Sequence, residues 1–193
     1  MTESLTTTLI DRIISSWPWY LIRGSGFAAA VILVLLIMGG IGQITGHTFK
    51  LLEPLKAWAG HRRLGIAFAI TTLIHVAGLF FDTFQKFTVS SIFIPFTSAY
   101  KPFFVGLGTL ALYLTIIVTL TSLRWHNTKP RVWKAVHYAS YAILGLVFVH
   151  GLFAGTDTAG GAIRIAWIAA GILITAIIIP RLRMAGSLRG PNI

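Results

Sequence analysis

Four of the six histidines form two pairs with nearly equal spacing along the chain. His61 and His75 are 14 residues apart, and His137 and His150 are 13 residues apart. Imidazole is a common axial ligand of b-type haem, whose iron takes one side chain from each face of the ring plane. Iron held by two histidines keeps no open position, which favours electron transfer over oxygen binding. These residues therefore predict ligands for two haems.

The stretches that carry these histidines are apolar. Of the 193 residues, 55% are hydrophobic and 11% are charged, whereas soluble domains carry about 25% charged residues. Five stretches come near the ~20 residues that a helix needs to cross hydrocarbon. We predict an all-α membrane protein, a bundle of about five transmembrane helices holding two stacked haems. The predicted spans are 25–45, 60–81, 102–123, 132–153 and 161–180.

The basic residues favour one orientation of these spans. The loops after the first and third spans and the C-terminal tail hold eleven Lys and Arg, and the other side holds five. Basic loops stay in the cytoplasm. We therefore expect a multi-pass protein of the cell membrane with the N-terminus outside and the C-terminus cytoplasmic. The net charge of +11 is explained by this anchoring, and no nucleic acid partner is expected.

The predicted topology pairs the histidines by level, because the second and fourth spans run in the same direction. His61 then lies level with His137 and His75 with His150, and the two levels are about 20 Å apart. An ideal helix turns His75 to within about 40° of His61, but leaves His150 about 140° from His137. Either the fourth span is distorted, for example near Gly145, or the two haems approach it from different sides.

A transporter that handles protons or metal ions through intramembrane histidines is the alternative function. Such proteins usually carry carboxylates within their spans, or broken helices. A structural membrane anchor is a third class, and it would not need paired histidines. The five acidic residues all lie in predicted tails, loops or helix ends, which argues against transport. They are Glu3, Asp11, Glu53, Asp82 and Asp157.

At this point the chain resembles the ferric reductase-like transmembrane domain family, whose relatives include the NADPH oxidases and the haem subunit of bacterial methionine sulfoxide reductase. The matching stretches are RGSGFAAAVILVLLIMGG, HRRLGIAFAITTLIHV, PFTSAYKPFFVGLGTLALYL and VWKAVHYASYAILGLVFVHGLFAGTDT, which cover most of residues 23–158. The resemblance implies a haem domain over residues 25–181, between an N-terminal surface segment (1–24) and a basic tail (182–193). It also implies haem b ligands at His61, His75, His137 and His150.

The resemblance implies an oxidoreductase subunit that needs a separate electron donor. No G-x-G-x-x-G motif and no strand pattern occur, so a nucleotide-binding domain is not expected. The donor would be a cytoplasmic protein, flavin on a partner, or a quinol. The acceptor would be an extracytoplasmic protein or a ferric chelate. Membrane lipid is the other expected partner.

Haem propionates favour basic and tyrosine side chains near the headgroups. Topological anchoring explains any single basic residue equally well. The candidates at the inner level are Arg62, Arg63, Arg131 and Lys134, and those at the outer level are Tyr100 and Lys101. The unpaired His47 and His126 are predicted to be solvated loop residues, although one of them could help a partner to dock. Glycines on the ligand-bearing helices, Gly65, Gly78, Gly145 and Gly151, are expected to admit a porphyrin or to allow close helix packing.

Overall fold

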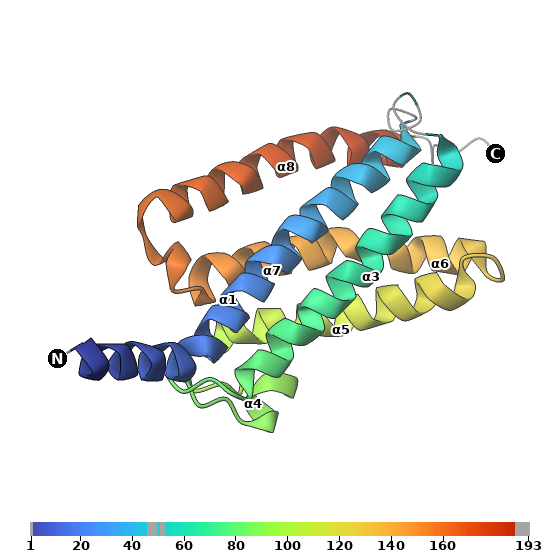
Figure 1. Ribbon diagram of the computed structural model, residues 1–193. Coiled ribbons are helices and arrows are strands. Elements are labelled where there is room, and N and C mark those ends of the chain that lie inside the picture. Colours follow the sequence, from blue (N-terminus) through green and yellow to red (C-terminus); the bar gives the residue numbers. More distant parts are fainter. Residues whose placement is uncertain (1, 46–49, 51–52, 188–193) are drawn as a thin grey trace.

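The protein is a helical bundle in the computed structural model, which describes residues 2–45, 50 and 53–187 (Figure 1). Its described elements are α1 (Thr2–Ile44), α3 (Pro54–Leu79), α4 (Val89–Phe93), α5 (Pro102–Trp125), α6 (Pro130–His137), α7 (Ala139–Ala154), the 3₁₀ turn η1 (Asp157–Ala159) and α8 (Gly161–Ser187). No strand occurs among the described residues. The all-α prediction is confirmed.

Five helical segments are long and apolar enough to cross a membrane, which confirms the predicted number. They are Ser15–Ile44, Pro54–Leu79, Pro102–Trp125, Pro130–Ala154 and Gly161–Pro180. Three of them begin at a proline, at Pro54, Pro102 and Pro130. Proline suits the first helical turn because its missing N–H would have no intrahelical partner there. These prolines account for starts that are up to six residues earlier than hydropathy alone predicts.

The first helix is longer than predicted, since α1 is continuous from Thr2 to Ile44 and contains Pro18. Figure 1 shows its first turns running at an angle to the rest of α1. A proline inside a helix removes one backbone hydrogen bond and bends the helix. Residues 2–17 therefore form a helical arm that leaves the bundle. The predicted N-terminal surface segment would be a helix of this kind. That this arm lies on a membrane surface stays a prediction.

The bundle consists of two closely packed helix pairs, α1 with α3 and α5 with α7. The two histidine-bearing helices, α3 and α7, make hardly any direct contact with each other. The buried core lies mainly between α1, α7 and α8, around Leu33, Ile143 and Ile174. Most apolar side chains elsewhere in the spans face outward, and Leu73 on α3 is 67% exposed. Outward-facing leucine and isoleucine suit a bundle surrounded by lipid.

The fourth predicted span is divided at Tyr138, between α6 and α7. The Tyr138 N–H lies within bonding distance of the carbonyls of both Lys134 and Val136. The Tyr141 N–H then bonds the Tyr138 carbonyl, three residues back, at 3.1 Å. Tighter winding of this kind changes the direction in which later side chains point. Of the two alternatives left open by the sequence, a distortion of the fourth span is present, and it follows His137 directly instead of lying near Gly145.

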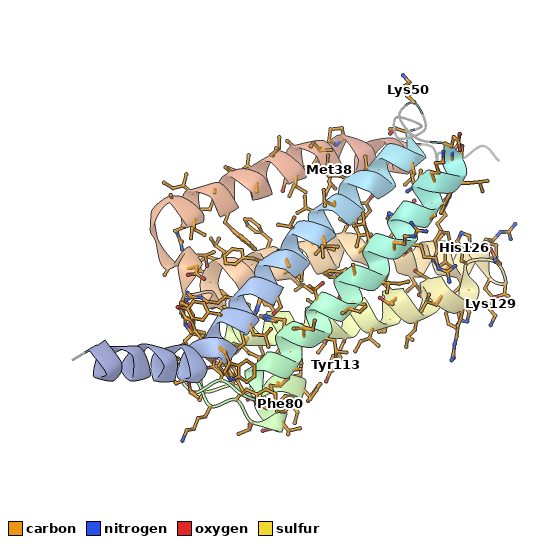
Figure 2. All side chains as sticks on the ribbon, viewed as in Figure 1. Met38, Lys50, Phe80, Tyr113, His126 and Lys129 are labelled. Carbon is orange, nitrogen blue, oxygen red and sulfur yellow. The ribbon has the colours of Figure 1, made fainter. Side chains whose placement is uncertain are left out.

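One end of the bundle gathers basic residues, and we call it the basic end. Figure 2 shows Lys50, His126 and Lys129 there, with Phe80 at the opposite end. The end of α1, the start of α3 and the connection from α5 to α6 all lie at the basic end (Figure 1). Both predicted inner loops thus share one end of the molecule, as the topology requires. The described Lys and Arg in these two loops and on the adjoining helical turns are Lys50, Lys56, Arg62, Arg63, Arg124, Lys129, Arg131 and Lys134.

The opposite end is closed by the segment between α3 and α5. Thr88 and Ser91 form a reciprocal capping box that starts the short helix α4. The Thr109 hydroxyl on α5 donates to the Ile92 carbonyl at 2.9 Å and ties this helix to the bundle. The segment therefore packs beside the outer histidines.

Candidate functional site

The structure brings the four histidines together in the two predicted pairs. His61 on α3 faces His137 on α6, with ring centroids 6.2 Å apart and an interplanar angle of 55°. His75 on α3 faces His150 on α7, with centroids 6.4 Å apart and an angle of 86°. In each histidine pair, one residue lies on α3 and the other lies on α6 or α7. The two rings face each other across the space that separates α3 from α7.

These separations suit two imidazoles on opposite sides of one metal ion. A first-row metal binds an imidazole nitrogen at about 2.0–2.1 Å, so the ring centroids of two opposed ligands are about 6.4 Å apart. Both observed distances lie close to this value. Each histidine pair therefore fits a metal centre with one imidazole on either side of the metal ion. That these histidines are metal ligands remains a prediction.

The outer pair is oriented by backbone carbonyls. Nδ1 of His75 lies 2.8 Å from the Ile22 carbonyl oxygen on α1, and Nδ1 of His150 lies 2.8 Å from the Phe104 carbonyl oxygen on α5. A carbonyl only accepts, so both Nδ1 atoms must carry the hydrogen. In a neutral ring the lone pair is then on Nε2. A hydrogen bond of this kind is what usually fixes the ring of a metal-binding histidine.

The inner pair is held differently. Nδ1 of His137 lies 3.2 Å from the Ser122 hydroxyl on α5, and the same hydroxyl accepts a 3.1 Å hydrogen bond from Trp133 Nε1. The Trp133 ring also packs on His137, with centroids 5.2 Å apart. Nδ1 of His61 is buried and has no hydrogen-bond partner. The His137 ring is thus oriented by a side chain, whereas both outer histidine rings are oriented by backbone carbonyls.

Small residues on α1 and α5 make room for the rings. A Cβ atom at Gly26 would lie 3.0 Å from the His75 ring, and one at Gly108 would lie 2.7 Å from the His150 ring. At Gly40 the corresponding distance to the His61 ring is 3.5 Å. The fourth small residue is Ser122, beside His137.

The sequence carried a signal for these positions that the histidine spacing alone did not reveal. Gly26 and Gly40 are 14 residues apart, as are Gly108 and Ser122. Each spacing nearly matches that of the histidines it faces. The glycines predicted on the histidine helices behave otherwise, since Gly78 packs on Ile22 and Gly151 on Trp167, whereas Gly65 and Gly145 have open space around them.

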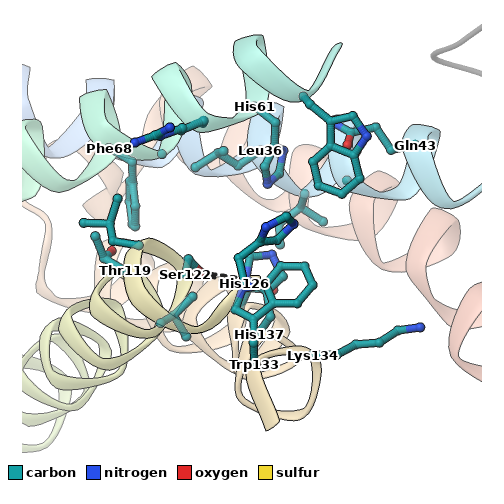
Figure 3. Close-up of a pocket in the computed structure, with 18 of the residues that line it drawn as sticks. Leu36, Gln43, His61, Phe68, Thr119, Ser122, His126, Trp133, Lys134 and His137 are labelled. Carbon is teal, nitrogen blue, oxygen red and sulfur yellow. Dashed lines mark hydrogen bonds between the residues drawn. The ribbon is translucent and has the colours of Figure 1, made fainter. Parts of the chain in front are cut away.

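A cavity of about 1120 Å³ lies at the basic end and includes both inner histidines (Figure 3). Ligand pockets usually measure about 300–1,000 Å³, so this cavity accommodates a large cofactor. Gly65 contributes to its wall, and porphyrin access at this position stays a prediction. Most of the remaining lining is apolar, from Leu33, Leu36, Ile37, Ile41, Phe68, Val118 and Ile143.

His126 is an exposed residue of the turn after α5, as predicted, and it also contributes to the lining of this cavity. Its ring packs edge-on against Trp133, with centroids 4.7 Å apart, and lies 5.6 Å from Trp58. The side chain is nevertheless exposed, and Figure 3 shows it beside Trp133 and His137. Sequence position suggested a loop, and only the return of α6 brings this residue over the inner site. His47 lies outside the described residues.

The outer pair borders a much smaller cavity, of about 60 Å³. Leu79, Phe87 and Leu112 are among the side chains that line it. The outer ring spacing and Nδ1 partners fit a bis-His metal centre, but this cavity is much smaller than the roughly 300–1,000 Å³ usual for ligand pockets. This difference in cavity size between the two levels could not be predicted from the histidine spacing.

The basic side chains predicted near the haem propionates separate into two groups. Arg62 and Lys134 line the inner cavity, whereas Arg63 and Arg131 are exposed and are not part of its wall. At the outer level, the Tyr100 hydroxyl donates to the Ala154 carbonyl at 3.0 Å, and Lys101 Nζ donates to the Phe153 carbonyl at 2.7 Å. These two residues cap the last turn of α7, which ends beside His150.

No group of three or more His, Cys, Asp or Glu side chains suited to a metal ion occurs in the part of the chain that the structure describes. The chain was also compared with family models, curated proteins and solved structures, and none of them matches it. The resemblance to ferric reductase-like proteins therefore stays a prediction. The geometry of the two histidine pairs is the observation on which function has to be argued.

Proposed function

We propose that this protein transfers electrons across a membrane through two b-type haems, each held between two histidines, as the membrane subunit of a ferric reductase-like oxidoreductase. The observation that carries this proposal is the pair of opposed imidazoles at two levels, with centroid separations of 6.2 and 6.4 Å. His61 and His137 would hold the inner haem, and His75 and His150 the outer one.

Two side-chain ligands per level favour haem over a bare ion. Structural metal sites usually take four or more ligands, and the described residues offer no cluster of that kind. Haem brings four ring nitrogens with its iron and needs only two more ligands from the chain. No intramembrane carboxylate accompanies the histidines, which argues against the alternative of a proton or metal transporter. The break at Tyr138 is a feature that transporters share, but it occurs here without such a carboxylate.

Haem iron, when bound, supplies one-electron chemistry between its ferric and ferrous states. The chain supplies the geometry. The Ile22 and Phe104 carbonyls orient the outer imidazoles, and Ser122 contacts the imidazole of His137. Apolar walls around the inner pair exclude ions, and two ligands per iron leave oxygen no place to bind. Arg62 and Lys134 in the cavity wall are suited to propionate carboxylates.

The proposed direction is from the cytoplasm outward, because the basic end favours the cytoplasmic side. The donor would be a cytoplasmic reductase, flavin on a partner, or a quinol, and the acceptor an extracytoplasmic protein or a ferric chelate. Since the inner cavity opens at the basic end, an outside donor would approach beside His126 and Trp58.

Haem content tests the proposal directly. The full chain would be expressed with ample haem, purified in detergent and analysed as its pyridine haemochrome against protein concentration. We expect two b haems per chain and the spectrum of six-coordinate, low-spin iron. A colourless protein would overturn the proposal, and one haem per chain would remove one of the two pairs.

A further inference from the structure

Ser122 is the side chain on which the inner site converges. Among the four paired histidines of the described chain, His137 alone has a side-chain partner at Nδ1, the Ser122 hydroxyl at 3.2 Å. The same oxygen lies 3.1 Å from Trp133 Nε1. An indole nitrogen only donates, so Ser122 accepts from Trp133.

The protonation pattern of His137 decides what Ser122 does. To bind a metal through Nε2, the neutral ring must carry its hydrogen on Nδ1, which then donates to Ser122. The reverse hydrogen bond, from the Ser122 hydroxyl to Nδ1, would place the hydrogen on Nε2 and block that atom as a ligand. The Ser122 oxygen has two lone pairs, so it can accept from Trp133 and from the Nδ1–H of His137 at the same time, which is the arrangement that metal binding through Nε2 requires.

We propose that Ser122 is a positioning residue for His137 and that Trp133, by sharing the serine oxygen, tunes how strongly this imidazole donates to iron. The inference rests on the function proposed above. The outer histidines use backbone carbonyls at 2.8 Å, which no side-chain replacement removes. The contact between His137 and Ser122 is longer, at 3.2 Å, and the Ser122 oxygen is shared with Trp133. The strength of this contact can therefore be changed by replacing either side chain.

The sign of the effect follows from ligand chemistry. A stronger acceptor at Nδ1–H makes the imidazole more basic, stabilises ferric iron and lowers the midpoint potential. Ser122→Ala removes the acceptor, so the inner midpoint should rise. Trp133→Phe keeps an aromatic ring beside His137 but removes the competing donor, so the inner midpoint should fall.

The experiment is a set of potentiometric measurements on the haem-loaded full chain, followed by haem absorbance. His61→Ala, which loses one inner ligand, identifies the midpoint that belongs to the inner haem. Ser122→Thr retains the oxygen and should restore the wild-type inner midpoint. Ser140→Ala is the matched control, because Ser140 also lines the inner cavity and forms no hydrogen bond with either inner histidine.

We expect opposite shifts of the inner midpoint in Ser122→Ala and Trp133→Phe, with the outer midpoint unchanged in both. If Ser122→Ala does not retain its inner haem, rescue by Ser122→Thr and the downward shift in Trp133→Phe carry the test. Shifts of the same sign, or inner midpoints that do not move, would overturn the role of Ser122. A wild-type chain without haem would instead overturn the proposed function, so the two failures are distinguishable.

Discussion

Each histidine depends on the one it faces. His75 and His150 oppose each other at 6.4 Å, and His61 and His137 oppose each other at 6.2 Å. Removing either member leaves one axial ligand, which no longer holds six-coordinate iron. Single alanine replacements should therefore give two phenotypes, loss of the outer or of the inner haem. Haem content and low-spin spectra of the four variants check this, and grouping of His61 with His150 would contradict the pairing.

Gly108 should matter as much as the histidine beside it. A methyl group there would lie 2.7 Å from the His150 ring, and the ring cannot retreat without losing its hydrogen bond to Phe104. Overpacking of this kind costs about 1–3 kcal/mol. We expect Gly108→Ala to reduce the haem content from two to one per chain.

The control for Gly108→Ala is Gly24→Ala on α1, where an added Cβ would meet nothing within 4 Å. This variant should retain both haems, because alanine in a helix costs no propensity relative to glycine. Equal haem content in the two variants would show that the outer ring tolerates displacement.

Among the helices, α1 and the connection from α7 to α8 are joined by a charged cluster. Arg23 Nε lies 2.5 Å from the Asp157 carboxylate, and both side chains are largely shielded, with 18% and 28% exposed. Arg23 also donates to Thr156 and packs over the Trp19 ring. We expect Asp157→Asn to destabilise the bundle by about 2 kcal/mol, because Arg23 loses its counter-charge where water is scarce.

Thermal unfolding in detergent measures this effect against a matched replacement. Glu53→Gln breaks the Glu53–Lys56 pair, whose side chains are 72% and 69% exposed. Exposed pairs contribute about 0–1 kcal/mol, so this control should unfold close to the wild type. Similar unfolding temperatures of the two variants would mean that the contacts of Arg23 with Thr156 and Trp19 are sufficient to stabilise its charge without Asp157.

The five spans could be predicted from their hydropathy. The two histidine pairs could be predicted because the topology places His61 level with His137, and His75 level with His150. A distortion of the fourth span was considered from the histidine spacing, but its position at Tyr138 was not predicted. A pattern of apolar residues does not show where the winding of the backbone changes. His126 was correctly predicted to be an exposed loop residue, but its contact with Trp133 was not predicted, because that contact depends on how α6 packs after the turn. The small residues opposite the rings belong to other helices, so their role became visible only when α1 and α5 were placed.

For the whole molecule, the basic end and the absence of a nucleotide-binding motif predict how electrons arrive. We expect that the purified chain will not oxidise NADPH or NADH by itself, and that its haems will be reduced when a flavin reductase, reduced flavin or quinol is added. Basic side chains around the cavity mouth would attract an acidic donor, and salt screens such attraction. Stopped-flow haem reduction across a salt series checks both points.

Two results would count against this picture of electron delivery. Rapid reduction by NADPH without added flavin or protein would mean that the chain binds the nucleotide directly. Reduction at a rate independent of salt would leave the haem proposal in place and limit the basic residues to topological anchoring.

The distance between the two histidine levels has an electrical consequence. Fourteen helical residues rise about 21 Å, roughly two thirds of a hydrocarbon layer of about 30 Å. An electron that passes between the levels would cross a similar share of the transmembrane voltage, or about 1.5 kcal/mol per 100 mV. An inside-negative potential should therefore shift electrons toward the outer haem by about tenfold per 100 mV. Haem spectra in liposomes clamped with valinomycin and potassium gradients measure this shift, and a distribution that ignores the voltage would place both levels on one side of the insulating layer.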